Sequence, residues 1–409
     1  MADGPVSAAA APSPARLRLP ARPALAVGVL YLGARAITTL FLFLAAAIAH
    51  ERTGGPETVA SLSMRWDGQW YWVVAAEGYP TELPRTAAGD VTQNAWAFLP
   101  VYPMLARGLS VVLGGQYPIA AILLSLIAGY AASLVLYHLL RERIDRTSAL
   151  WAVALFAAGP LSALFQMGYA ESLFLFWLLA ALWALVRRRF VWLYALIPLM
   201  GFTRPGALAF ALLLGLYGIA RWLRRRADPL PARQIVHVVA LGALAVAVGF
   251  AWQAIAGAVT GEPSAYLETE LSWRRDWIGG ETGFVPFAGF VEASTIWFRV
   301  WGLPEPLAYV ALIVGVVAIA AVLLVEPHVR RLGMEMRLWS ASYVLYLLLV
   351  FFPQSSIFRL LLPLAPLYGA VALPPSRAWR VSMLALGLVG QWWWIYQMLA
   401  LGTTFTQIP

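Results

Sequence analysis

The chain has 409 residues, of which 61% are hydrophobic and 12% are charged, and its formal net charge is +9. A soluble domain could not bury so much apolar surface, so the composition predicts a polytopic helical membrane protein. Its apolar runs are about twenty residues long, as in bilayer-crossing helices, and lack the alternation of membrane barrels. The chain has no cysteine and no lysine, which excludes thiolate chemistry, disulfides and Schiff-base catalysis. Its positive charge comes from arginine, which fits cytoplasmic loops better than nucleic-acid binding.

The first predicted element is an Ala/Pro-rich stretch, residues 1–23, which we expect to be a disordered cytoplasmic tail. The rest, residues 24–409, is expected to form one transmembrane domain. A first helix over about 24–49 precedes a first outer loop over 50–117. Within this loop, residues 97–113 contain two prolines and an arginine, and we predict a re-entrant or interfacial helix that does not cross.

Further spans follow in chain order, and most have the length that a helix needs to cross a bilayer. The total is about eleven, and a second large outer loop occupies residues 259–307. The spans after the first loop are predicted at 119–140, 148–166, 171–186, 190–223 (two spans with a break at 201–206), 235–258, 308–325, 338–352, 360–373 and 381–400.

The arginine clusters decide the sidedness of these spans. If the N-terminus is cytoplasmic and residues 97–113 do not cross, every cluster lies in the cytoplasm, as the positive-inside rule requires. The remaining polar stretches then share the outer face, where we expect the site. No internal repeat is visible, although many transporters have one. The clusters are residues 141–146, 187–189, 221–226, 330–331 and 377–380.

The stretch from Met64 to Pro103 surrounds one acid, Asp67, with tryptophan and tyrosine side chains. Aromatic rings of this kind gather at the membrane–water interface. A helix over about 66–76 would place Asp67 and Tyr71 on one face. The sequence leaves two interpretations of Asp67 open: a catalytic acid or base, and a residue that caps this helix or responds to its dipole.

Four other charged residues lie in or beside apolar runs. An acid such as Glu171 within membrane segments is a functional candidate, but it could instead pair with Arg204 or Arg35 to hold helices together. Arg204 and Arg359 lie near predicted outer ends of spans, where they could serve a site or only anchor their helices. For Arg35, in the middle of the first span, we expect a structural pair.

The second outer loop offers weaker candidates for acceptor binding. Tryptophans with nearby charges suit sugars or lipid headgroups, but an interfacial aromatic belt would look the same. The four histidines are scattered, and no metal-ligand spacing occurs, so no metal ligand is assigned. The candidate acceptor residues are Trp273, Arg274, Asp276 and Trp277.

Four short motifs, in order along most of the chain, resemble those of a known family. The first comprises residues 65–67 (RWD), 77–79 (EGY) and 97–103 (AFLPVYP). The others are residues 169–174 (YAESLF), residues 201–206 (GFTRPG), and Arg359 before Pro363. Together they resemble the PIG-V-like family, which is similar to the enzymes that add the second mannose to GPI anchors. Two departures are Pro205, where the family tends to have a small polar residue, and the lack of an acid adjacent to Asp67.

The resemblance implies an all-α GT-C glycosyltransferase fold and a mannosyltransferase. It implies inverting transfer of mannose from a polyprenyl-phosphate donor to a lipid, glycan or protein acceptor on the non-cytoplasmic face. Asp67 would be the general base. The resemblance leaves a divalent cation, magnesium or manganese, open as a cofactor. The implied contacts to donor phosphate and sugar are Arg65, Trp66, Gln69, Tyr71, Tyr102, Tyr169, Glu171, Arg204 and Arg359.

Two alternative functions fit the same sequence. The same fold could use another polyprenyl-phosphate sugar, such as arabinofuranose or glucose. The chain could also be a membrane transporter of lipids or solutes, a class in which midplane charges and repeats are common. The arginine-only, Ala/Leu/Trp-rich composition is typical of GC-rich bacterial genomes, so we expect a bacterial plasma membrane and no true GPI pathway.

Overall fold

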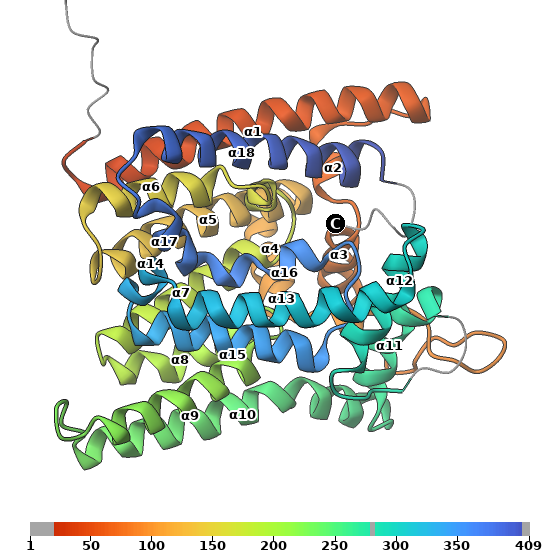
Figure 1. The fold of residues 1–409 in the computed structure, drawn as a ribbon. Helices are drawn as coiled ribbons and strands as arrows, with labels where there is room; N and C mark the ends of the chain where they lie inside the picture. The colour runs from red at the N-terminus through yellow and green to blue at the C-terminus, as the bar shows by residue number, and fades with distance from the viewer. Residues whose placement is uncertain (1–19, 279–282, 403–409) are drawn as a thin grey trace, which may run out of the picture.

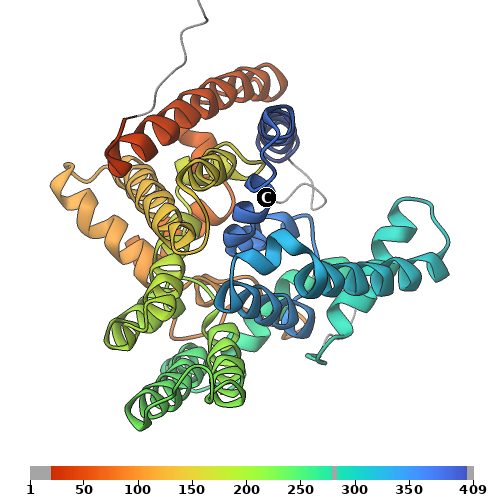
Figure 2. The same cartoon turned by 60° about the vertical axis from the view of Figure 1, so that its left-hand side comes forward.

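The computed structural model describes residues 20–278 and 283–402, and the side chains of residues 276–278 are not among those described. Most of the predicted tail, residues 1–19, lies outside this part of the chain. The described residues are helical apart from loops and one isolated β-bridge between Arg85 and Val91. The helices lie side by side in a bundle, from which α12 and the start of α13 project (Figures 1 and 2).

In chain order the elements are α1 Pro23–Thr53, α2 Val59–Ser63, α3 Asp67–Glu77, η1 Ala95–Ala97, α4 Val101–Val112, α5 Tyr117–Arg141, α6 Arg146–Ala157, η2 Ser162–Gln166, α7 Glu171–Val186, α8 Phe190–Gly201, α9 Ala207–Leu223, α10 Ala232–Thr260, α11 Ala265–Ile278, α12 Ala288–Val300, α13 Glu305–Val325, α14 Pro327–Arg331, α15 Met334–Val350, α16 Ile357–Leu360, η3 Leu362–Leu367, α17 Tyr368–Ala372, α18 Arg377–Ile395 and η4 Tyr396–Ala400.

Four helices, α1, α5, α10 and α13, are long and apolar enough to cross a membrane. The shortest of them, α13, has 21 residues and is therefore about 30 Å long, which matches the apolar core of a bilayer. Only 11% of its apolar window is buried within the protein, so its remaining surface suits lipid contact. Several shorter apolar helices accompany these four. The chain is thus a multi-pass membrane protein, and the count of about eleven spans stays a prediction.

Proline and glycine mark several helix ends, as the backbone preferences of these residues require. Helix α1 starts at Pro23 and ends at Thr53, and the next residue, Gly54, caps it with a left-handed φ of 68°. The predicted break at residues 201–206 is confirmed, because α8 ends at Gly201 and α9 starts at Ala207. The span expected over residues 148–166 is not one continuous helix: α6 ends at Ala157 and a short 3-10 helix follows. Gly159 and Pro160 interrupt this run, and proline cannot continue a helix.

The bundle has two chemically different ends. Ion pairs join the loops that carry the arginine clusters at one end of the bundle. Arg143 pairs with Glu335 at 3.0 Å, Arg187 with Glu142 at 3.5 Å and Arg188 with Asp228 at 2.6 Å. The opposite end, on the right in Figure 1, carries α2, α3, α11 and α12. We call these the arginine-rich end and the site end.

Helix α4 lies at the site end, within the segment predicted not to cross. Its 12 residues extend about 18 Å, well short of the roughly 30 Å apolar core. The Tyr102 hydroxyl donates to the Ala121 carbonyl at 2.9 Å, and the Val101 N–H donates to the Phe202 carbonyl at 3.1 Å. Helix α4 therefore packs beside the first half of α5.

Backbone carbonyls, and no carboxylate among the described residues, bind the Arg35 side chain, so the predicted ion pair of Arg35 is wrong. Its Nη1 and Nη2 groups donate to the Ser162 and Ala157 carbonyls, both at 2.5 Å. Its guanidinium also lies 5.3 Å from the ring centre of Tyr31. The last carbonyls of a helix have no partner within that helix. The early end of α6 at Ala157 supplies such an acceptor, and Arg35 fills that role.

Candidate active site

A tight turn places Asp67 at the start of α3. The Gly68 N–H donates to the Arg65 carbonyl at 3.2 Å, which closes a turn with Trp66 and Asp67 at its centre. Trp66 has φ 58° and ψ −119°, a conformation that glycine usually occupies in such turns. A non-glycine residue in this region costs about 1–3 kcal/mol and is often found at functional sites.

Two hydrogen bonds dock this turn against the start of α7. The Gly168 N–H donates to the Ser63 carbonyl at 2.9 Å, and the Tyr169 hydroxyl donates to the Arg65 carbonyl at 2.9 Å. Because α7 begins at Glu171, these bonds bring Asp67 and Glu171 to the same region. The motif around residues 65–67 and the motif at residues 169–174 are therefore in direct contact.

Asp67, Glu171, Arg204 and Arg359 form one ion-pair cluster, which we call the charge cluster. Arg359 Nη1 lies 2.5 Å from Asp67 Oδ2 and 3.5 Å from Glu171 Oε1. Arg204 Nη1 lies 2.8 Å from the same Glu171 oxygen. The Glu171 side chain is only 3% exposed. Two carboxylates and two guanidinium groups thus balance one another, which the low polarity of a buried site requires.

The geometry bears on the two alternatives for Asp67. The N-cap of α3 is Trp66, and Asp67 is the first helical residue. Its carboxylate contacts Arg359, and the helix dipole also favours a negative charge there. Of the two arginine partners that the sequence offered for Glu171, the structure shows the pair with Arg204, and Arg359 is a second partner.

Three polar atoms at or beside the charge cluster have no hydrogen-bond partner among the described residues. They are Trp66 Nε1, Glu171 Oε2 and Arg359 Nε. A buried donor or acceptor without a partner costs about 1–3 kcal/mol. Two donors and one acceptor are therefore free for a polar substrate at this point.

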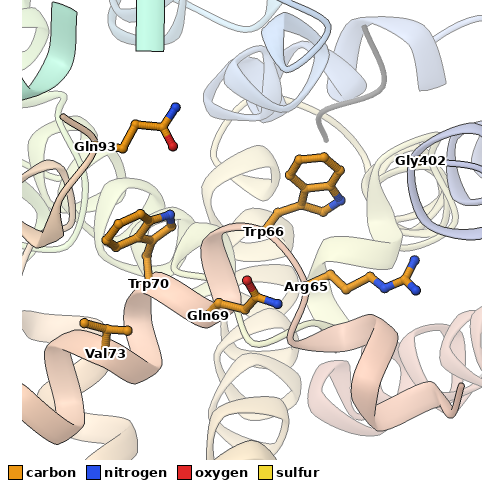
Figure 3. Close-up of a pocket in the computed structure, with 7 residues that line it drawn as sticks. All are labelled: Arg65, Trp66, Gln69, Trp70, Val73, Gln93 and Gly402. Atoms are coloured by element: carbon orange, nitrogen blue, oxygen red, sulfur yellow. The ribbon is translucent and has the colours of Figure 1, made fainter. Parts of the chain in front are cut away.

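A pocket of about 550 Å³ opens beside the first turn of α3 (Figure 3). Figure 3 shows Trp66 and Trp70 on either side of Gln69, with Gln93 across the space. Aromatic faces with amide groups suit a sugar ring, and the volume is ordinary for a small-molecule site. Asp67 is not a lining residue, so the charge cluster and this pocket flank the same turn. The lining residues are Arg65, Trp66, Gln69, Trp70, Val73, Gln93 and Gly402.

Three tyrosines among the predicted donor contacts make packing contacts within the protein. Tyr102 is fully buried, and its hydroxyl contacts the Ala121 carbonyl and Ser125, so it holds α4 against α5. The buried Tyr71 ring packs 5.1 Å from that of Tyr102. The guanidinium carbon of Arg359 lies 5.9 Å from the ring centre of Tyr169. Tyr169 thus touches the charge cluster directly, while Tyr71 and Tyr102 pack α3 against α4.

Arg65 lines the pocket but is also tied into the protein. It pairs with Glu57, and its Nη1 donates to the Leu399 carbonyl at 2.9 Å. This second bond links the first loop to η4 near the end of the described chain. The Arg65 guanidinium is therefore already engaged by the protein, although the residue lines the pocket.

The candidate acceptor residues on α11 make structural contacts. Trp273 packs 6.0 Å from Trp70, and the Asn94 side chain donates to Thr269 at 2.8 Å, so α11 is docked on the first loop. Arg274 pairs with Glu292 and is not a free acceptor contact. The side chains of Asp276 and Trp277 lie outside the described residues.

Glu270, also on α11, is a titratable residue that the sequence analysis did not single out. It lies one helical turn before Trp273, and the charges of Asp67 and Arg204 act on its pKa in opposite directions. The residue is partly exposed, but desolvation of its carboxylate by the surrounding protein disfavours the charged form and raises its pKa to about 7. A hydrogen bond with Tyr266 lowers the pKa, and the Asp67 carboxylate raises it. Its only signal in the sequence is its spacing from Trp273.

Glu270 predicts a specific pH dependence of stability. Because its pKa is raised on folding, the folded state holds this proton more tightly than the unfolded state does between about pH 4.5 and 7. Its contribution to stability is therefore lost as pH rises through this window. We expect the melting temperature of the wild type, relative to Glu270→Gln, to fall between pH 5 and pH 8. Equal slopes for both proteins would contradict this, and Glu268→Gln is the matched control.

Metal binding was left open by the sequence. Within residues 20–278 and 283–402, no group of three or more His, Cys, Asp or Glu side chains could hold a metal ion. Asp67 and Glu171 both contact arginines in this structure. A divalent cation therefore stays a prediction for a chelator experiment.

Comparison with known proteins gives structural similarity at low sequence identity. No family model matches the chain, and no curated protein matches it significantly. The chain is similar to the archaeal oligosaccharyltransferase AglB from Archaeoglobus fulgidus, in a structure with an inhibitory peptide and a dolichol-phosphate. The TM-score is 0.44 and the sequence identity is 14%. The similarity covers 90% of this chain and 55% of that one. A second structure, the Archaeoglobus fulgidus oligosaccharyltransferase with Zn and sulfate, gives a TM-score of 0.42 and 14% identity over 89% and 53%. The chain spans about half the length of these proteins.

Proposed function

We propose that this chain is a membrane glycosyltransferase with a GT-C fold, related to the PIG-V-like family. It transfers mannose from a polyprenyl-phosphate donor to an acceptor hydroxyl, with inversion at the sugar. The observation that carries this proposal is the charge cluster. Each of its members comes from a different motif of the family resemblance, and Asp67 and Arg359 meet although 292 residues separate them.

The two arginines suit a lipid phosphate as leaving group. Guanidinium groups bind phosphate oxygens through paired, charge-assisted hydrogen bonds. Arg359 Nε has no partner among the described residues, so it can donate to a phosphate oxygen. As the bond between the sugar C1 and the phosphate oxygen breaks, negative charge grows on that oxygen. Fixed cations beside it stabilise the transition state.

Asp67 is the proposed general base. The acceptor oxygen attacks C1 from the side opposite the phosphate, its proton passes to Asp67, and polyprenyl phosphate leaves. In this structure Arg359 Nη1 lies 2.5 Å from Asp67 Oδ2, so this carboxylate oxygen is engaged in an ion pair. A donor phosphate that binds Arg359 competes for this contact. Donor binding thereby prepares Asp67 for proton transfer.

The pocket beside α3 is the proposed place for the donor sugar. Trp66, Gln69 and Trp70 line it and offer aromatic faces and an amide group. The positive-inside rule puts the arginine-rich end in the cytoplasm, so we propose that transfer takes place on the non-cytoplasmic face. The plasma membrane of a bacterium is the proposed location.

The direct test is transfer of labelled sugar by membranes that contain the protein. Polyprenyl-phosphate mannose, glucose and arabinofuranose are supplied separately, and label is followed into lipid, glycan and protein fractions. Membranes without the protein are the control, and an EDTA arm tests the divalent cation. Transfer from the mannose donor alone supports the proposal, whereas preference for another donor assigns a different sugar. Movement of labelled lipid across vesicles without any transfer would favour the transporter alternative.

A further inference from the structure

A second pocket, of about 450 Å³, lies at the arginine-rich end, opposite the charge cluster. Its walls come from the chain after α5, the α7–α8 loop, the end of α9, α14 and α15, so distant segments build it together. Six of its ten lining residues are arginines. The lining residues are Arg143, Arg188, Arg221, Arg224, Asp228, Arg330, Gly333, Met334, Glu335 and Arg337.

The carboxylates in this pocket neutralise only part of its charge. Asp228 pairs with Arg188 at 2.6 Å and with Arg221 at 3.0 Å, and Glu335 pairs with Arg143 at 3.0 Å. Six guanidinium groups therefore face two carboxylates, an excess of four positive charges. Among the residues that the structure describes, no carboxylate lies within ion-pairing distance of the other three lining arginines, which are Arg224, Arg330 and Arg337.

Some of these cations are fixed in place before any ligand binds. Arg221 is 1% exposed, and it donates to the Tyr217 hydroxyl at 2.9 Å and to the Pro229 carbonyl at 3.0 Å. Arg337 Nε donates to the Leu323 carbonyl at 2.8 Å, near the end of α13. A side-chain carbon on Gly333 would lie 2.7 Å from Arg143 Nε, so glycine gives that guanidinium its position.

The positive-inside rule explains why arginines occupy this end of the helices, but not why they converge on one hollow. Like charges repel at short range, and separate loops would lower this repulsion by keeping the arginines apart in water. A concave site with fixed guanidinium groups and uncompensated charge matches a compact anion with several oxygens. Basic pockets between membrane helices bind phospholipid headgroups in the same way.

We infer that this pocket is a binding site for a phosphate-bearing anion, separate from the proposed donor site. Two sources share this chemistry: the headgroup of an anionic phospholipid in the adjacent leaflet, and a soluble phosphate compound. The inference does not depend on the proposed function, because the charge cluster contributes no residue to this pocket.

The test compares two double variants of the full-length protein in detergent. Arg224→Gln with Arg330→Gln removes two exposed lining cations that have no ion pair among the described residues. Arg225→Gln with Arg331→Gln removes the adjacent arginines, which do not line the pocket, and is the matched control. Binding is read from the melting temperature during titration with phosphatidylglycerol, with phosphatidylcholine, or with pyrophosphate.

We expect phosphatidylglycerol to stabilise the wild type and the control variant, and phosphatidylcholine to have little effect. The lining variant should bind the anion at least about tenfold more weakly, which corresponds to the loss of one charge-assisted hydrogen bond. Stabilisation by pyrophosphate alone, with the same dependence on the variants, would support the site and assign its ligand to the soluble source. The inference is wrong if neither anion stabilises the protein, or if both variants respond equally.

Discussion

Asp67→Asn is expected to abolish sugar transfer while the protein still inserts and folds. Asparagine keeps the size of the side chain and can still accept a hydrogen bond from Arg359, but it cannot take the acceptor proton. Loss of a general base typically lowers a rate by about 10²–10⁴-fold. Labelled transfer from polyprenyl-phosphate mannose, measured in membranes with matched protein levels, gives the rate.

Glu77→Gln is the control for this experiment. Glu77 lies at the other end of α3, is exposed, and loses the same charge on substitution. We expect it to keep wild-type transfer and a wild-type melting temperature. Wild-type transfer by Asp67→Asn would overturn the assignment of the base. If that variant lost activity through unfolding, its melting temperature would fall well below that of Glu77→Gln.

Breaking the pair between Glu171 and Arg204 should have the largest effect on stability. Glu171→Gln leaves Arg204 without a carboxylate and leaves Arg359 with Asp67 alone. Removal of one partner from a buried ion pair costs about 3–5 kcal/mol, because the other charge stays buried. The free energy of unfolding, measured in mixed micelles with increasing denaturing detergent, should decrease by this amount.

A double-mutant cycle separates the pair from its surroundings. Arg204→Gln alone should also destabilise, but Glu171→Gln with Arg204→Gln should cost less than the sum of the single variants, by about 1–3 kcal/mol. Strict additivity would show that the 2.8 Å contact contributes nothing to stability. The exposed pair between Arg85 and Glu262 serves as the comparison, where a coupling of at most about 1 kcal/mol is expected.

The positions of the long helices could be predicted from the sequence because membrane segments obey local rules. A helix must satisfy its backbone within itself in an apolar medium, so apolar length and flanking charges define its ends. Predicted and observed bounds agree closely for α5, at 119–140 and 117–141, and for α10, at 235–258 and 232–260. The sequence analysis expected the four residues of the charge cluster on one face, and in the structure they lie in contact.

Contacts that depend on tertiary packing could not be predicted in the same way. Arg35 is satisfied by carbonyls, which requires that α6 stop early and that its end meet α1. From the sequence, Tyr102 is typical of an aromatic residue at the membrane interface. In the structure its hydroxyl donates to a carbonyl of α5. Glu270 stands in an ordinary polar segment, and only the docking of α11 through Trp273 and Trp70 brings it to the site. None of these partners is near in sequence.

The charge cluster also imposes an order on the making of the protein. Asp67, Glu171 and Arg204 are synthesised and inserted long before Arg359, which follows Glu171 by 188 residues. Until α16 arrives, two carboxylates have one guanidinium between them, and the site carries a net negative charge. The last quarter of the chain therefore completes the electrostatics of the first loop. A protein truncated before α16 would leave Asp67 without its arginine partner.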